Sequence, residues 1–164
     1  MVEVITNPTE VLLAVPEIYA TSVSHPNLTP RTLDQLKAIA SRGDIVLIKA
    51  NEDLIGWGIR EVLTKNLKEV GLMFIKPEFR TASAFAALAR GLAADSGGLV
   101  LASYDPSLIR HAVLEFGFRE ANLIQVIIKS RGRFLAKRLS KDSRRAVAGH
   151  LKSSKPLFAI RGKK

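Results

Sequence analysis

The sequence predicts an α+β fold in which a central mixed, mostly antiparallel sheet is flanked by helices and followed by a basic C-terminal helical segment. Two observations predict this class. Helical patterns come first and three closely spaced strand patterns follow, after which helices and strands alternate along the chain. The chain has 164 residues and is 47% hydrophobic, which is enough to bury the core of one domain.

The N-terminal part predicts two helices. The first is expected over residues 9–23. The second is expected to begin with Thr29 as its N-cap and Pro30 at its first position, because these residue types are favoured there, and to end at Gly43. No strand is expected before the first helix.

Three strands are expected next. The segments "DIVLIKA" and "LIGWGIREVL" flank the turn "NED", which indicates a β-hairpin, and a third strand over residues 69–75 can pair with the second. Gly56 and Gly58 flank Trp57, and two interpretations stay open for them. Either a substrate backbone approaches the sheet at this point, or close packing or a bulge uses the space.

The next part of the chain predicts a helix, a strand and a second helix. The first helix starts at residue 80, and its apolar face carries four residues: Phe85, Leu88, Ala89 and Leu92. "LVLASY" is expected to be a strand parallel to residues 69–75, because a helix connects the two. The segment "DPSLIRHAVLEFG" predicts a helix with Asp105 as N-cap and Gly117 as the stop.

The remaining segments predict a long strand, "FREANLIQVIIK", a basic helix and a last strand within "KPLFAIRGKK" that returns to the sheet. The helix is expected to be two-sided. Its apolar side carries Leu135, Ala136, Leu139, Ala146 and Val147. Its basic side carries Arg133, Lys137, Arg138, Lys141, Arg144, Arg145 and Lys152, with Phe134 among them. We expect residues 1–124 to form the main domain and residues 125–164 to be a basic segment packed on it.

The basic charge is concentrated in this C-terminal segment. The net charge is +10, and residues 125–164 hold 13 lysines and arginines against one acidic residue, Asp142. A cationic segment attracts polyanions through counterion release, so nucleic acid is the first partner to consider and an acidic protein or membrane surface the second. The alternative is a solvated basic helix without a partner.

Several classes of function are disfavoured. The chain has no cysteine, and His25, His111 and His150 are far apart, so a metal site is not expected. The N-terminus lacks the basic start of a signal peptide, and no apolar run approaches the roughly 20 residues that span a bilayer. A cytoplasmic location without a membrane partner is therefore expected. The oligomeric state leaves no signal in the sequence.

Two motifs resemble those of the GNAT acetyltransferase superfamily. In "EVGLMFIKPEFRTASAFAALARGLA", the residues Ile75, Pro77, Arg80 and Ser83 match the strand end, the proline, the basic residue and the first glycine of the family's loop. In "LVLASYDPSLIRHAVLEFGF", the ending "LEFGF" matches the close of a second family motif. The resemblance covers roughly residues 43–123 in detail. The compact chain also resembles acetyltransferase-like proteins of bacteriophages.

The resemblance implies acetyl-CoA as the cofactor. Its pyrophosphate would bind the start of the helix after Arg80, where free N–H groups attract anions and small side chains allow close approach. The implied cofactor-binding residues are Met73, Phe74 and Ile75, whose backbones would pair with the pantetheine arm, and Arg80, Thr81, Ala82, Ser83, Ala84 and Phe85. The loop has Ser83 and Phe85 where the family has glycines. The Phe85 ring either crowds the cofactor or turns into the core.

The resemblance also implies two catalytic residues. Glu69 has the position of the glutamate that deprotonates the attacking amine in some family members. The alternative is that Glu69 is an ordinary exposed residue at a strand end. Val113 stands where many members have the tyrosine that protonates the leaving thiolate, and Tyr104 and His111 are substitutes by proximity, with packing and solvated roles as the alternatives.

Two functions follow as hypotheses. The first is an acetyl-CoA-dependent N-acetyltransferase that acts on an amine of a protein, a peptide or an RNA-linked acceptor. The second is a non-catalytic protein of the same fold that binds nucleic acid or an acidic partner through its basic helix. An unrelated α+β fold with similar spacing is the third alternative.

Overall fold

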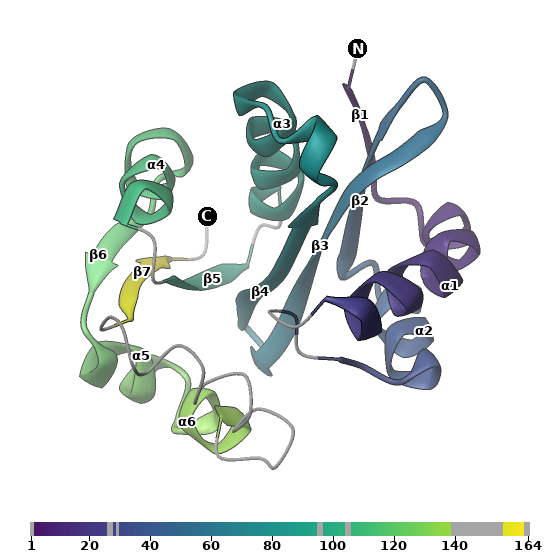
Figure 1. The fold of residues 1–164 in the computed structure, drawn as a ribbon. Coiled ribbons are helices and arrows are strands. Elements are labelled where there is room, and N and C mark those ends of the chain that lie inside the picture. Colours follow the sequence, from purple (N-terminus) through teal and green to yellow (C-terminus); the bar gives the residue numbers. More distant parts are fainter. Residues whose placement is uncertain are drawn as a thin grey trace. The chain divides into compact units, whose positions relative to one another are not determined.

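A computed structural model describes residues 2–25, 28, 30–94, 97–103, 106–138 and 156–162, without the side chain of residue 138. Figure 1 labels the elements. The elements are β1 (Val2–Ile5), α1 (Pro8–Ser24), α2 (Leu33–Ser41), β2 (Ile45–Ala50), β3 (Asp53–Thr64), β4 (Leu67–Ile75), the 3₁₀ helix η1 (Pro77–Phe79), α3 (Ala82–Ala93), β5 (Gly98–Ser103), α4 (Pro106–Phe116), β6 (Arg119–Ala121), α5 (Leu123–Lys129), α6 (Arg133–Arg138) and β7 (Leu157–Arg161).

The strands form a mixed seven-stranded sheet in the order β1-β2-β3-β4-β5-β7-β6. The ladders β1–β2, β2–β3, β5–β7 and β6–β7 are antiparallel. The β4–β5 ladder is parallel and pairs residues Leu67 to Val70 with Gly98 to Leu101. The predicted α+β class, the hairpin, the parallel pair and the returning last strand are all confirmed.

The chain forms two compact units, one of residues 1–61 and 71–95 and the other of residues 62–70 and 96–164. The predicted division into a main domain of residues 1–124 and a basic segment of residues 125–164 packed on it stays a prediction. No helix within the described ranges is long and apolar enough to cross a membrane.

In the first unit, helices cover both faces of strands β2 and β3 (Figure 1). Trp57 belongs to a core that includes Val15, Ile18 and Leu36 of α1 and α2. The next residue, Gly58, points the other way, and a Cβ added there would lie 2.7 Å from Leu92 of α3. Because neighbouring residues of a strand face opposite sides of the sheet, Trp57 faces α1 and α2, and Gly58 faces α3.

The glycines around Trp57 are explained by packing. A Cβ added to Gly56 would lie 2.7 Å from the carbonyl oxygen of Phe74, and one added to Gly58 would meet Leu92. Gly91 of α3 similarly faces Val46, at 2.6 Å from an added Cβ. Small residues on both partners therefore let α3 lie close against the sheet.

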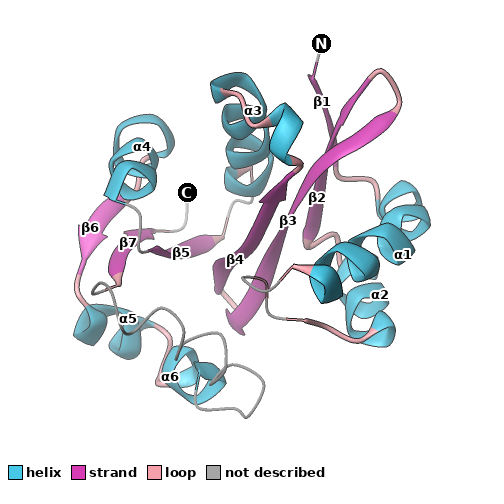
Figure 2. Ribbon diagram, in the orientation of Figure 1, coloured by secondary structure: helices cyan, strands magenta, loops and turns pink. Residues whose placement is uncertain are grey.

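In the second unit, α4 lies on one side of β5, β6 and β7, and α5 and α6 lie on the other (Figure 2). The core on the α5 and α6 side contains Val100, Val126, Phe134, Phe158 and Ile160. The rings of Phe134 and Phe158 are 5.8 Å apart and meet edge to face. Phe134 thus anchors α6 to β7.

Three expectations about secondary structure are wrong. A short strand, β1, precedes the first helix and pairs with β2. The second helix is capped by Thr32, which exchanges hydrogen bonds with Gln35, and Thr29 lies outside the described residues. The expected long strand is only Arg119–Ala121, because Asn122 and Gln125 form a capping box that starts α5.

Candidate active site

The junction between β4 and α3 is a turn held by side-chain and backbone hydrogen bonds. The N–H of Lys76 donates to the carbonyl of Ile55 on β3 at 2.9 Å. Arg80 folds back so that its Nε donates to the carbonyl of Ile75, the last residue of β4, at 3.1 Å. Arg80, predicted to bind the cofactor, therefore braces the strand end from an exposed position.

The start of α3 offers two backbone donors to a ligand. Thr81 is the N-cap, and its Oγ1 accepts a hydrogen bond from the N–H of Ala84 at 3.2 Å. The N–H of Phe85 donates to the carbonyl of Thr81 at 3.0 Å. The N–H groups of Ala82 and Ser83 have no acceptor within the part of the chain that the structure describes. Both residues are exposed, so an anion can reach these groups.

The two replaced glycines have different consequences. Ser83 is exposed, and its hydroxyl lies 3.0 Å from that of Thr81, so it adds a polar group beside the two free N–H groups. Phe85 is half-buried beside the buried face of α3, and its N–H already has an acceptor. Replacing a glycine by Phe85 therefore removes no donor from the site. The residues at the helix start fit a pyrophosphate group.

The predicted apolar face of α3 is partly correct. Leu88 and Leu92 are buried as expected, whereas Phe85 and Ala89 are half-buried. The buried positions are Ala84, Ala87, Leu88, Gly91 and Leu92. Small residues occupy this face because the sheet lies so close.

The end of β4 extends beyond its ladder with β5. Val70 is the last β4 residue in that ladder, so Met73, Phe74 and Ile75 lie further along the strand. The carbonyl of Phe74 lies on the side of β3, next to Gly56. Because successive residues of a strand direct their polar groups to opposite edges, Met73 and Ile75 present theirs to the other edge. Met73 and the N–H of Ile75 are thus better placed than Phe74 to pair with a pantetheine arm, since the carbonyl of Ile75 already accepts a hydrogen bond from Arg80.

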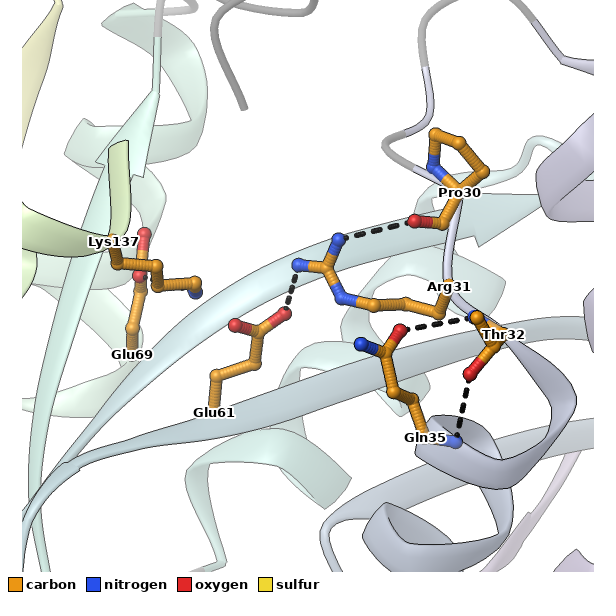
Figure 3. Close-up of polar contacts among 7 residues, drawn as sticks. All are labelled: Pro30, Arg31, Thr32, Gln35, Glu61, Glu69 and Lys137. Carbon is orange, nitrogen blue, oxygen red and sulfur yellow. Dashed lines mark hydrogen bonds and ion pairs between the residues drawn. The ribbon is translucent and has the colours of Figure 1, made fainter. Parts of the chain in front are cut away.

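Glu69 is a buried carboxylate with a cation beside it. Its side chain is 4% exposed, and its Oε2 accepts a hydrogen bond from Nζ of Lys137 at 2.9 Å. Figure 3 shows the pair. Glu69 is therefore not the exposed strand-end residue of the alternative interpretation. A carboxylate that holds an ammonium in this way is placed to take a proton from an amine.

The orientation of α6 differs from the expected one. Phe134 is 1% exposed, and Lys137 lies on the same side, whereas Leu135 is 40% exposed. An Nη of Arg133 donates to the carbonyl of Leu63 at 3.3 Å. Burial of the Phe134 ring sets which side packs, so Lys137 turns toward the protein, whereas Arg133 stays exposed. The two-sided pattern is wrong for Phe134, Leu135 and Lys137.

Several predicted site residues lie outside the described part of the chain. They are Tyr104, the side chain of Arg138, Lys141, Arg144 and Arg145. His111 is half-buried, and its ring lies 5.4 Å from that of Phe116, edge to face. Within the described ranges no group of three or more acidic, histidine or cysteine residues could hold a metal ion.

The structure adds an ion pair that sequence reasoning missed. An Nη of Arg31, in the segment before α2, lies 2.6 Å from Oε1 of Glu61, and both side chains are at most 15% exposed. Figure 3 shows that Arg31 also donates to the carbonyl of Pro30. A Cβ added to Gly71 would lie 3.6 Å from the same Glu61 oxygen, so the carboxylate lies over β4. Thirty residues separate the partners, and no local pattern reveals them.

Comparisons with known proteins give matches only among solved structures. No family model and no curated protein matches the chain. Rv2747 from Mycobacterium tuberculosis, solved in complex with CoA and NLQ, has a TM-score of 0.62 and 15% identity, over 96% of this chain and 97% of that one. Naa50 from Arabidopsis thaliana, with a bisubstrate analogue, has a TM-score of 0.59 and 13% identity, over 98% of each chain.

A GNAT family acetyltransferase from Bacillus cereus has a TM-score of 0.55 and 11% identity, over 100% of this chain and 99% of that one. None of these three proteins comes from a bacteriophage, so they do not support the phage-type resemblance. At such low identities, the likeness is one of architecture. The chain therefore has the fold of the GNAT acetyltransferases.

Proposed function

We propose that the protein is an acetyl-CoA-dependent N-acetyltransferase that acts on an amine. One observation carries the proposal: among the described residues, the N–H groups of Ala82 and Ser83 have no acceptor, and they lie at an exposed helix start just beyond η1. Two such donors at the positive end of a helix dipole suit a pyrophosphate. The fold adds support, because similar structures have been solved with CoA bound.

The chain's own residues would divide the work as follows. Ala82 and Ser83 would bind the pyrophosphate through their N–H groups, and Met73 and Ile75 would offer backbone groups to the pantetheine arm. When bound, acetyl-CoA supplies the acetyl thioester. Glu69 belongs to the other compact unit, and its role as the base that takes a proton from the acceptor nitrogen stays a prediction. Tyr104 as the proton donor to the leaving thiolate, and the choice among protein, peptide and RNA-linked acceptors, stay predictions.

Calorimetric titration with acetyl-CoA tests this proposal, with Ser83→Asp as the diagnostic variant. Ser83 is the second residue of α3, so a carboxylate there interacts favourably with the helix dipole and repels the pyrophosphate. We expect the wild-type protein to bind, and the variant to keep its fold and bind about tenfold or more weakly.

Thr9→Asp is the matched control. Thr9 is the second residue of α1, is also exposed, and lies in the same unit, so it receives the same charge at another helix start. We expect it to bind as the wild type does. The proposal fails if the wild type gives neither heat nor a thermal shift at millimolar acetyl-CoA, or if Ser83→Asp binds unchanged.

A further inference from the structure

Helix α5 carries large apolar side chains on two opposite sides. Val126 is 0% exposed in the core of the second unit, whereas Ile124 and Ile128 are 67% and 70% exposed. Residues four positions apart lie on the same side of a helix, so the two isoleucines are neighbours on the side away from Val126. The core therefore uses one side of α5 and leaves an apolar pair facing solvent on the other.

The surface around this isoleucine pair is cationic. Residues 121–138 contain five lysines and arginines and no acidic residue. Lys137 is held by Glu69, but the side chains of Lys129, Arg131 and Arg133 are exposed. Like charges that meet across an interface oppose binding, so this surface is poorly suited to contact a second copy of itself. Its charge is complementary to an anionic partner.

A groove of about 430 Å³ opens beside Ile128, between α5 and the strand β6. Arg119 and Lys129 line it with positive charge, and Glu120 carries the one negative charge among its lining residues. The buried side chain of Ile160 adds apolar surface. The groove thus offers a cationic rim and an apolar interior, next to the exposed isoleucine pair.

The combination of exposed isoleucines and cations decides between the classes of anionic partner. Nucleic acid is bound chiefly through its phosphates, which contact cations and have no use for aliphatic side chains. The surface of an anionic membrane uses both, because aliphatic side chains enter the acyl boundary while lysines and arginines attract the headgroups. A lipid surface is therefore the partner that both features favour.

We propose that α5 binds the surface of an anionic lipid membrane. Ile124 and Ile128 enter the acyl boundary, and Lys129 and Arg131 contact the headgroups. No membrane partner was expected from the sequence, because no segment is long enough to span a bilayer, but a helix that lies on the surface needs no such length. The inference does not depend on acetyl-CoA, whose proposed binding residues belong to the other unit.

Sedimentation of the full chain with lipid vesicles tests the inference. One set of vesicles contains phosphatidylcholine and phosphatidylserine in equal parts, and the other contains phosphatidylcholine alone. We expect binding to the anionic vesicles to be at least about tenfold stronger and to weaken as salt is added. The rest of the basic segment also attracts anionic lipid through charge, so changes to the isoleucines are diagnostic.

The diagnostic variant combines Ile124→Gln and Ile128→Gln, which remove apolar surface and keep both the charge and good helix formers. It should bind anionic vesicles at least about tenfold more weakly than the wild type. Leu13→Gln is the matched control, because Leu13 is 80% exposed on a helix of the other unit, and it should bind as the wild type does. Lys129→Gln should weaken binding by about fivefold. Circular dichroism and calorimetry should show an unchanged fold and unchanged binding of acetyl-CoA.

Three results would overturn the inference. The first is equal binding of the wild type to both kinds of vesicle, and the second is equal binding of the wild type and the isoleucine variant to anionic vesicles. The third is a wild-type dimer in sedimentation velocity that the isoleucine variant converts to a monomer, because a second copy then covers the pair. A single-stranded oligonucleotide should bind wild type and variant alike, and a loss confined to the oligonucleotide would assign the surface to nucleic acid instead. A failure to bind acetyl-CoA would overturn only the proposed function.

Discussion

Removing either partner of the Glu69–Lys137 pair should destabilise the protein, and the two losses should differ. Lys137→Met removes the ammonium that donates to a carboxylate that is 4% exposed. Breaking a fully buried ion pair in this way costs about 3–5 kcal/mol, and a surface pair contributes about 0–1 kcal/mol. Lys137 is 28% exposed, which places the cost between these limits, at about 2–3 kcal/mol.

Glu69→Gln should cost less. The amide oxygen can still accept a hydrogen bond from Lys137, and the ammonium can turn toward water, so we expect a loss of about 1 kcal/mol. For a chain of 164 residues, 1 kcal/mol corresponds to a shift in Tm of about 2–4 °C. Lys137→Met should therefore lower Tm by about 6 °C and Glu69→Gln by about 3 °C. The double variant should show a coupling free energy of about 1–2 kcal/mol.

Thermal and urea unfolding followed by circular dichroism provide these values, with Lys76→Met and Glu17→Gln as a matched cycle on an exposed pair. That control cycle should show a coupling free energy below about 0.5 kcal/mol. Trp57 fluorescence should be recorded in parallel, because Trp57 reports on the unit that does not contain the pair. A coupling free energy near zero for Glu69 and Lys137, or a larger loss for Glu69→Gln than for Lys137→Met, would refute the reasoning.

Three further predictions concern packing, capping and charge. Gly91→Ala should lower Tm by a few degrees in thermal unfolding. Alanine favours a helix over glycine by about 1 kcal/mol. However, its Cβ would lie within 2.8 Å of both Val46 and Val4, and such overpacking costs about 1–3 kcal/mol. A higher Tm would contradict this packing. Asn122→Ala should cost about 1 kcal/mol in urea unfolding, because it removes the cap that Gln125 completes, and an unchanged midpoint would show that α5 does not depend on it. The third prediction concerns a variant in which three residues of the basic segment, Lys141, Arg144 and Arg145, are replaced by glutamate. If this segment binds nucleic acid, the slope of log affinity against log salt should fall by up to about 3, and binding equal to the wild type would remove the hypothesis. Lys137 is left intact there, since its reversal would place two carboxylates together.

The secondary structure could be predicted where the signal is local. The hairpin of β2 and β3, the helix α3 and the parallel strand β5 follow from patterns within ten or twelve residues. The helix α5 was missed because its β-branched residues favour a strand, although Asn122 and Gln125 have the spacing of a capping box. Strand β1 is only four residues long, and its pairing with β2 is not visible in its own sequence.

The candidate site, too, could be predicted only where its residues are close together in the sequence. The strand end, the turn and the helix start at Thr81 are consecutive in the chain, so the sequence shows them together. The partner of Glu69 is 68 residues away, and its position follows from the packing of Phe134 in the core. Helical periodicity alone assigned Lys137 to the solvent side. Burial of the Phe134 ring on this short helix determines which side packs, and the charged residues beside it do not.

The loop without glycines is best judged by its hydrogen-bond donors. A glycine helps a phosphate site by allowing close approach, but the N–H groups bind the anion, and every residue type except proline carries one. At the start of α3, Thr81 occupies the N–H groups of Ala84 and Phe85, which leaves those of Ala82 and Ser83. The side chains that an anion meets there are a methyl group and a hydroxymethyl group. Binding should therefore depend on position 83, where charge and size act directly on the ligand, and much less on position 85, whose N–H is already bonded.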